Sequence, residues 1–158
     1  MSELAVAQVL DGLDTPWQVR TRFDAAAIAL ADRHYSRRPS KRGSNQVGGV
    51  GRTLTLVSPC ERALWVTRYL LKPMDNLDAW RNTYFHNEGA RLSSELIAEA
   101  MRITLLLWGE PPGDGWVTWI DTRKVRATTN PGYCFKKAGW WLDRTYRHPH
   151  LVRLRALT

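Results

Sequence analysis

The chain has 158 residues with a formal net charge of +8, and 44% of its residues are hydrophobic, enough for one well-packed domain spanning residues 1–158. Cys60 and Cys134 are too few and too far apart for a disulfide framework or a zinc site, and no apolar run is long enough to cross a membrane. We therefore expect a protein of a reducing, cytoplasmic compartment with no metal site, no membrane contact and, because of its basic charge, an acidic partner, most simply nucleic acid.

The first elements expected are a strand, a helix and a long loop. Residues 17–23 alternate between apolar and polar side chains, which is typical of a strand. Asp24 then has the side chain and the position of an N-cap for an alanine-rich helix that ends near Arg33. The polar, glycine-dotted stretch 36–51 that follows is too long for a simple connector, so we expect it to have a function.

The rest of the chain alternates between strand-like and helix-like patterns. Apolar residues recur at helical spacing over residues 93–108, and Gly109 with the prolines after it ends that helix. The other expected elements are strands at 52–57, 63–70, 80–85, 116–120, 141–146 and 151–157 and a short helix at 133–138. This order predicts an α/β fold with a mixed central sheet of about six to seven strands and flanking helices.

The most informative stretch is residues 84–97, where a strand ends in a glycine turn and leads directly into the long helix. The first N–H groups of a helix are unpaired and its N-terminus carries partial positive charge, so such an entrance binds anions well. Arg91 at this entrance would lie against a diphosphate, and the Ser93 and Ser94 hydroxyls would add donors. The alternative is an ordinary helix with Ser93 or Ser94 as its N-cap and a solvated Arg91.

Positive charge is concentrated in two segments that flank an acidic middle. Residues 33–52 hold six Lys or Arg and no acid, and residues 122–147 hold seven against Asp143 alone. If the two segments meet in space they form one positive face, and if they do not they are solvated loops. The residues expected to contact phosphates are Arg37, Arg38, Lys41, Arg42, Arg123, Lys124 and Arg126.

Four further residues have either a structural or a catalytic interpretation. His34 and Tyr35 either finish the first helix and pack on the sheet, or act as acid–base or stacking groups. Asp121 at the end of a strand either caps the next loop or orients and deprotonates an amine, because strand-end carboxylates face the cleft of open α/β sheets. Cys134 is expected to be a small buried residue, since no histidine with a catalytic context accompanies it.

The order of elements and two short motifs resemble the GNAT acyltransferase superfamily. Residues 87–96, with Gly89 as the retained glycine, resemble the loop that binds the acyl-CoA pyrophosphate, and residues 130–140 resemble a block late in that fold. The resemblance implies acetyl-CoA or another acyl-CoA as the cofactor, held by Asn87, Gly89, Ala90, Arg91, Ser93, Ser94 and Asn130.

Within that superfamily, residues 34–38 (His-Tyr-Ser-Arg-Arg) resemble the phage Mom-like group, whose members modify bases of phage DNA with an acyl-derived group. A lone aspartate at a strand end before a basic loop fits that group too. The resemblance implies that Tyr133, if it is not a core residue, protonates the departing thiolate. The catalytic candidates are then Asp121, Tyr133, Tyr35 and His34, and a phage gene would place the protein in the host cytoplasm.

The sequence thus predicts a GNAT-like acyltransferase that uses an acyl-CoA to modify an amine, most simply on a DNA base. A non-catalytic nucleic-acid-binding module on the same fold is the first alternative, because Gly89 alone remains of the usual glycines of the pyrophosphate loop. A small-amine acetyltransferase with incidental basic charge is the second. The acyl group, the acceptor and the oligomeric state are left open.

Overall fold

A computed structural model describes residues 10, 12–125 and 129–157. The described elements follow the expected order of strand, helix, three strands, helix, strand, helix and two strands, with a short 3₁₀ helix added after the first helix. Their bounds are β1 (Gln18–Arg20), α2 (Ala25–Arg33), η1 (Pro39–Lys41), β2 (Arg52–Val57), β3 (Ala63–Tyr69), β4 (Trp80–Asn87), α3 (Ser93–Trp108), β5 (Trp116–Asp121), α4 (Tyr133–Lys137), β6 (Trp141–Leu142) and β7 (Leu151–Ala156).

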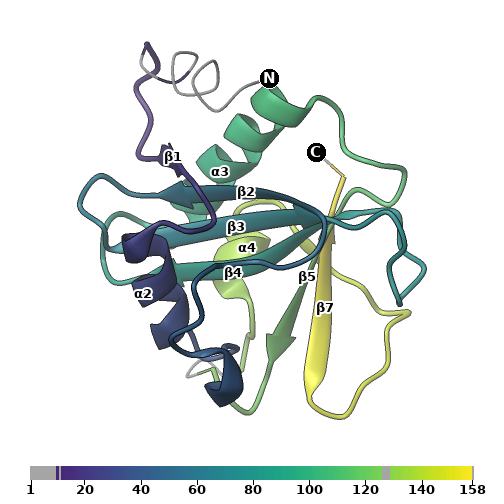
Figure 1. The fold of residues 1–158 in the computed structure, drawn as a ribbon. Coiled ribbons are helices and arrows are strands. Elements are labelled where there is room, and N and C mark those ends of the chain that lie inside the picture. Colours follow the sequence, from purple (N-terminus) through teal and green to yellow (C-terminus); the bar gives the residue numbers. More distant parts are fainter. Residues whose placement is uncertain (1–9, 11, 126–128, 158) are drawn as a thin grey trace.

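The described strands form one open sheet of seven strands in the order β1-β2-β3-β4-β5-β7-β6. Neighbouring strands run antiparallel except β4 and β5, which are parallel. Parallel neighbours need a long crossover connection, and α3 supplies it (Figure 1). The α/β class and the mixed sheet predicted from the sequence are therefore confirmed.

Alternate side chains of each strand point to opposite faces of the sheet, so the sheet has a core on each face. On one face, α2 places Leu30 against Leu64 and Val66 of β3. On the other face, α3 and α4 cover a larger cluster in which Trp65 and Trp116 are fully buried. Figure 1 shows α2 in front of the sheet and α4 behind it.

The two long helices begin in different ways. The Asp24 carboxylate accepts the Ala27 N–H at 3.0 Å, so the predicted N-cap of α2 is confirmed. At α3 the N-cap position is occupied by Leu92, which offers no side-chain acceptor. The alternative in which Ser93 or Ser94 caps this helix is contradicted, because both residues already lie in its first turn.

Two strands are shorter than their alternating sequences predicted. β1 ends at Arg20 because the chain turns there, with the Asp24 N–H donating to the Thr21 carbonyl at 3.2 Å. β6 ends at Leu142 because the next residue, Asp143, turns the chain by accepting hydrogen bonds from Thr145. Local side-chain acceptors of this kind compete with strand pairing.

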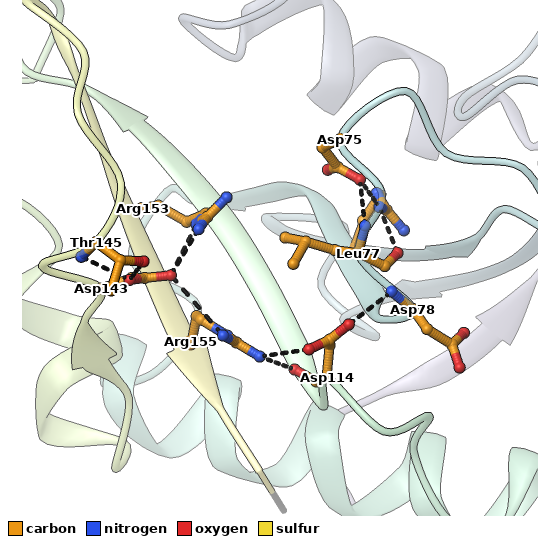
Figure 2. Close-up of polar contacts among 9 residues, drawn as sticks. Asp75, Leu77, Asp78, Asp114, Asp143, Thr145, Arg153 and Arg155 are labelled. Atoms are coloured by element: carbon orange, nitrogen blue, oxygen red, sulfur yellow. Dashed lines mark hydrogen bonds and ion pairs between the residues drawn. The ribbon is translucent and has the colours of Figure 1, made fainter.

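The Asp143 carboxylate also begins a polar network along β7 (Figure 2). It pairs with Arg153 at 2.8 Å, and Arg155 reaches Asp114 at 3.2 Å. Asp114 in turn accepts the Asp78 N–H at 2.9 Å. Burial opposes ionisation of Asp143, but the hydrogen bonds that it accepts lower its pKa to about 2. The network ties the loops that precede β4 and β5 to β7 and so fixes the start of the parallel pair.

None of the helices in the described part of the chain is both long and apolar enough to cross a lipid bilayer.

Candidate active site

The parallel strands β4 and β5 separate soon after they begin. Their registered pairing stops after Arg81 and Val117. Next to that pair the Thr118 hydroxyl, rather than a backbone N–H, donates to the Asn82 carbonyl at 3.1 Å. β4 also bulges at Thr83, which its register with β3 skips. From this point on, the facing backbone groups of the two strands have no strand partner.

A cavity of about 810 Å³ occupies the space between the separated strands. Phe85 and Ile120 line it from β4 and β5. Residues 34–36, which follow α2 on one face of the sheet, form one part of the wall, and residues 132–135, at the start of α4 on the other face, form another. The cavity therefore connects the two faces of the sheet and is large enough for an extended ligand.

The Asn87 side chain shapes the turn between β4 and α3. Its oxygen accepts the N–H groups of Gly89 and Ala90 at 3.1 and 2.9 Å. Its amide group donates to the Arg91 carbonyl and to the Ser93 hydroxyl, each at 2.8 Å. Gly89 has φ +81°, a left-handed conformation that glycine adopts without strain. The predicted cofactor-binding turn is thus a preformed structure, and Asn87 and Ser93 lie on the cavity wall.

The N-terminus of α3 has free donors at the edge of this cavity. Because Leu92 provides no cap, the N–H groups of Ser93 and Ser94 have no hydrogen-bond partner among the described residues. Arg91 is exposed and forms no ion pair within the described part of the chain. These groups present the donors and the positive charge that an anion requires.

His34 is a buried, neutral residue on the cavity wall. Its Nδ1 accepts the Ser36 N–H at 3.1 Å and lies 2.7 Å from the Ser36 hydroxyl, so the neutral ring carries its proton on Nε2. Burial, and then the nearby His86, lower the pKa of His34 to about 4, while the Phe85 backbone opposes this shift. His34 thus presents an acceptor, not a cation, to the Ser36 hydroxyl.

Tyr35 brings the end of α2 to the end of β5. Burial raises the pKa of Tyr35 to about 12, the Asp121 backbone opposes this, and the charges of Asp121 and Cys134 add to it. Three elements therefore meet at this phenol, which stays protonated at neutral pH and lines the cavity. Burial also raises the pKa of Cys134, in line with the prediction that this thiol is not a nucleophile.

The Asp121 carboxylate is not on the cavity wall. It accepts hydrogen bonds from the Arg123 N–H at 3.0 Å and from the Arg123 guanidinium at 3.1 and 2.9 Å. These contacts, opposed by burial, lower the pKa of Asp121 to about 2. A carboxylate this acidic and already paired is a poor general base, so of the two predicted roles the structure supports the ordering of the next loop.

Tyr133 is the first residue of α4 and is 55% exposed, so it is not a core residue. Tyr133 lines the cavity. The preceding Gly132 has φ +72°, and a Cβ there would collide with the Leu154 side chain, so glycine is required to begin this helix. Asn130, which was expected to hold the cofactor, instead accepts a hydrogen bond from Lys136 at 2.6 Å and lies outside the cavity wall.

Arg37 is not available to clamp phosphate, and that prediction is wrong. The residue is 4% exposed, and its guanidinium pairs with Asp32 at 3.1 Å and donates to the Tyr84 and Ser44 hydroxyls. An arginine with these partners holds the loop after α2 against β4. The sequence alone does not show that Arg37 pairs with Asp32 of the preceding helix.

The other cations of the predicted phosphate set lie on the two segments that border the cavity, because residues 34–36 and Val125 are both on its wall. Arg123 is paired with Asp121, and Arg126 lies outside the described residues. Of the predicted phosphate set, Arg38, Lys41, Arg42 and Lys124 are exposed and form no ion pair in the described part of the chain.

Sequence reasoning missed five polar strand residues of the cavity wall, namely Arg68, Arg81, Asn82, Thr83 and Thr118. Each lies within a strand that was expected from its apolar content. A charged or amide side chain inside such a strand was the available signal, because polar groups in buried strands need a partner or a function.

Acidification from pH 7 toward pH 4 is expected to destabilise the protein through His34. The pKa of this residue is about 4 in the folded protein against an ordinary value of 6.5. Between these values the unfolded chain binds a proton that the folded protein does not. The free energy of unfolding therefore decreases as the pH is lowered, by up to about 3 kcal/mol. Urea unfolding at several pH values measures this. His34→Asn should flatten the dependence and His150→Asn should not, and a flat parent curve would contradict the assignment.

Among the described residues, no group of three or more His, Cys, Asp or Glu side chains could hold a metal ion. Compared with protein-family models, with curated proteins and with solved structures, the chain matches none. Its function must therefore be inferred from the site itself.

Proposed function

We propose that this chain is a GNAT-like acyltransferase that transfers an acyl group from an acyl-CoA, such as acetyl-CoA, to an amine on a DNA base. The observation that best supports the proposal is the separation of the parallel strands β4 and β5 around a cavity that has the N-terminus of α3 at its edge. An acyl-CoA needs donors for its diphosphate and a slot for its extended arm, and this arrangement offers both.

The chemistry follows from the residues on the wall. The N–H groups of Ser93 and Ser94, with Arg91, would hold the diphosphate, and the cavity between β4 and β5 would take the extended arm of the acyl-CoA. Backbone N–H groups of β4 that have lost their β5 partners polarise the thioester carbonyl. The amine nitrogen attacks the carbonyl carbon, the C–S bond breaks, and the thiolate takes a proton from the Tyr133 hydroxyl.

The amine must also lose a proton in this reaction. Because Asp121 is held by Arg123, water in the open cavity takes this proton and a proton then returns to Tyr133. The neutral His34 and the protonated Tyr35 contribute polar groups to the cavity wall beside the ends of β4 and β5.

DNA is the proposed acceptor because exposed, unpaired cations border the cavity on two sides. A base inside a DNA duplex cannot reach a thioester that lies between β4 and β5, so the target base must leave the base stack. Phe85 and Trp119 on the cavity wall offer aromatic surfaces for such a base. A binding module without catalysis and a small-amine acetyltransferase are the alternatives that the experiments distinguish.

Arg91→Ala is expected to weaken acetyl-CoA binding by about 1–3 kcal/mol, as for the loss of a charge-assisted contact to a phosphate. Isothermal calorimetry with acetyl-CoA measures the change. Arg102→Ala is the matched control, because Arg102 is an exposed arginine further along the same helix that pairs with Glu99. Equal affinity of the Arg91 variant and the parent would remove Arg91 from the cofactor site, and no binding by the parent would favour the module without catalysis.

A further inference from the structure

Three arginines lie together on the α2 face of the sheet, beyond the apolar contacts of α2. Arg68 of β3 is opposite Arg81 of β4 in the strand register. Arg22 reaches the same place from the loop after β1, where it donates to Thr53, the β2 neighbour of Arg68. Arg68 and Arg81 both line the cavity.

Two of these arginines are satisfied by the protein. Arg81 pairs with Asp75 and donates to the carbonyls of Leu77 and Ala79. Arg22 donates to the carbonyls of Gly49 and Gly51, at 2.8 and 3.0 Å, in addition to Thr53. Their guanidinium groups therefore have the roles of structural cross-links.

Arg68 is different, because most of its donors are unused. Its guanidinium donates to the Val50 carbonyl alone among the described residues, and its Nε is buried with no hydrogen-bond partner. No carboxylate of the described residues lies within ion-pair distance of it. Burial, and then the charges of Arg22 and Arg81, lower the pKa of Arg68.

A half-buried arginine without a counter-ion is costly for a protein to keep. An anion in the cavity would use the free donors of Arg68 and would also offset the charge of its two neighbours. The planar guanidinium suits an oxyanion with two acceptor oxygens, such as a phosphate or a carboxylate.

The position of Arg68 separates it from the proposed cofactor turn. Its partner Arg81 is the second residue of β4 and Asn87 is the last, so the two ends of the cavity wall are about 20 Å apart along the strand. A cofactor whose diphosphate lies at α3 leaves the Arg68 end for the other substrate.

We propose that Arg68 binds an oxyanion of the acceptor substrate, and that this anion is the phosphate next to the base to be modified. The inference rests on the proposed acyl transfer and names the group by which the acceptor is recognised. A carboxylate on a small amine would use the same chemistry, and the experiment distinguishes the two sources.

The test measures binding of small anions without any turnover. Calorimetry is performed with the four deoxynucleoside 5′-monophosphates and with the matching deoxynucleosides, and then with alanine and alaninamide as the carboxylate pair. The proteins are the parent, Arg68→Gln, Arg68→Lys and the control Arg102→Gln. We expect the monophosphates to bind the parent more tightly than the nucleosides, and Arg68→Gln to lose about tenfold to a hundredfold of that affinity. Arg68→Lys should keep part of it, and Arg102→Gln, which changes an exposed arginine outside the cavity wall, should keep all of it.

The melting temperature gives a second readout. A structural Arg68 would make Arg68→Gln less stable, whereas an unpaired functional arginine leaves the variant as stable as the parent or more so. If Arg68→Gln loses only alanine binding, Arg68 binds an oxyanion but that oxyanion is a carboxylate. This result would contradict the proposal that Arg68 binds a phosphate of the acceptor. Equal anion affinity in the parent and Arg68→Gln, or no anion-dependent binding at all, would overturn the inference. Acetyl-CoA titrations on the same proteins test the cofactor site separately, so that failure of one proposal is distinguishable from failure of the other.

Discussion

Binding of duplex DNA is expected to weaken by orders of magnitude when the salt concentration rises a few-fold. The exposed cations Arg38, Lys41, Arg42 and Lys124 lie on the two segments that border the cavity and form no ion pair within the described residues. If these and their neighbours contact about six phosphates, the logarithm of the affinity falls with a slope of about −5 against the logarithm of the salt concentration. A fourfold rise in salt then lowers the affinity by about a thousandfold.

The triple variant Arg38→Gln, Lys41→Gln, Arg42→Gln should make this slope less steep by about 3, as expected for the loss of about three phosphate contacts. Arg37 is left unchanged because its guanidinium is buried and its removal would damage the fold. Lys72→Gln with Arg102→Gln serves as the control, since both residues are exposed outside the two basic segments. Fluorescence titration of a labelled duplex at several salt concentrations gives the slopes, and a flat response of the parent would favour the small-amine acetyltransferase.

The order of the elements could be predicted because it depends on local periodicity. The helical spacing in residues 93–108 arises from burial on one face of the helix, and the apolar content of residues 52–57 arises from burial on both faces of the strand, so both are visible in the sequence. The ends of β1 and β6 were not visible. They depend on turns made by Thr21 and Asp143, where a local hydrogen bond competes with the next strand pair.

The local turns of the site were predictable, whereas the pairing of its charged side chains was not. The turn at residues 87–93 is organised by Asn87 within itself, and Gly132 places Tyr133 by its own backbone conformation. Arg37 was assigned to phosphate, and Asp121 was given two possible roles, because the sequence does not show that they pair with Asp32 and Arg123, only five and two residues away. The charge of Arg68 within an apolar strand was a visible signal, but the sequence does not show whether that arginine has a partner.

Replacement of Tyr133 by phenylalanine is expected to abolish most turnover while leaving both substrates bound. The Tyr133 side chain lines the cavity at the start of α4, and its hydroxyl is the proposed proton donor to the departing thiolate. Removal of a general acid typically costs about 10²–10⁴ in rate. The ring is kept in the variant, so acetyl-CoA and DNA should bind with the affinity of the parent.

The assay is mass spectrometry of nucleosides from DNA incubated with acetyl-CoA and each variant. Tyr146→Phe is the matched control, because Tyr146 packs its ring on the Arg153 guanidinium at 4.7 Å, a contact that phenylalanine keeps. Asp121→Asn should keep its turnover, since that carboxylate is held by Arg123 away from the cavity wall. Full modification by Tyr133→Phe would remove the phenol from the mechanism, and loss of turnover in Asp121→Asn alone would return the proton transfer to the carboxylate. A parent protein that binds DNA but leaves every base unmodified with several acyl-CoA donors would make the fold a nucleic-acid-binding module whose cavity serves recognition and not transfer.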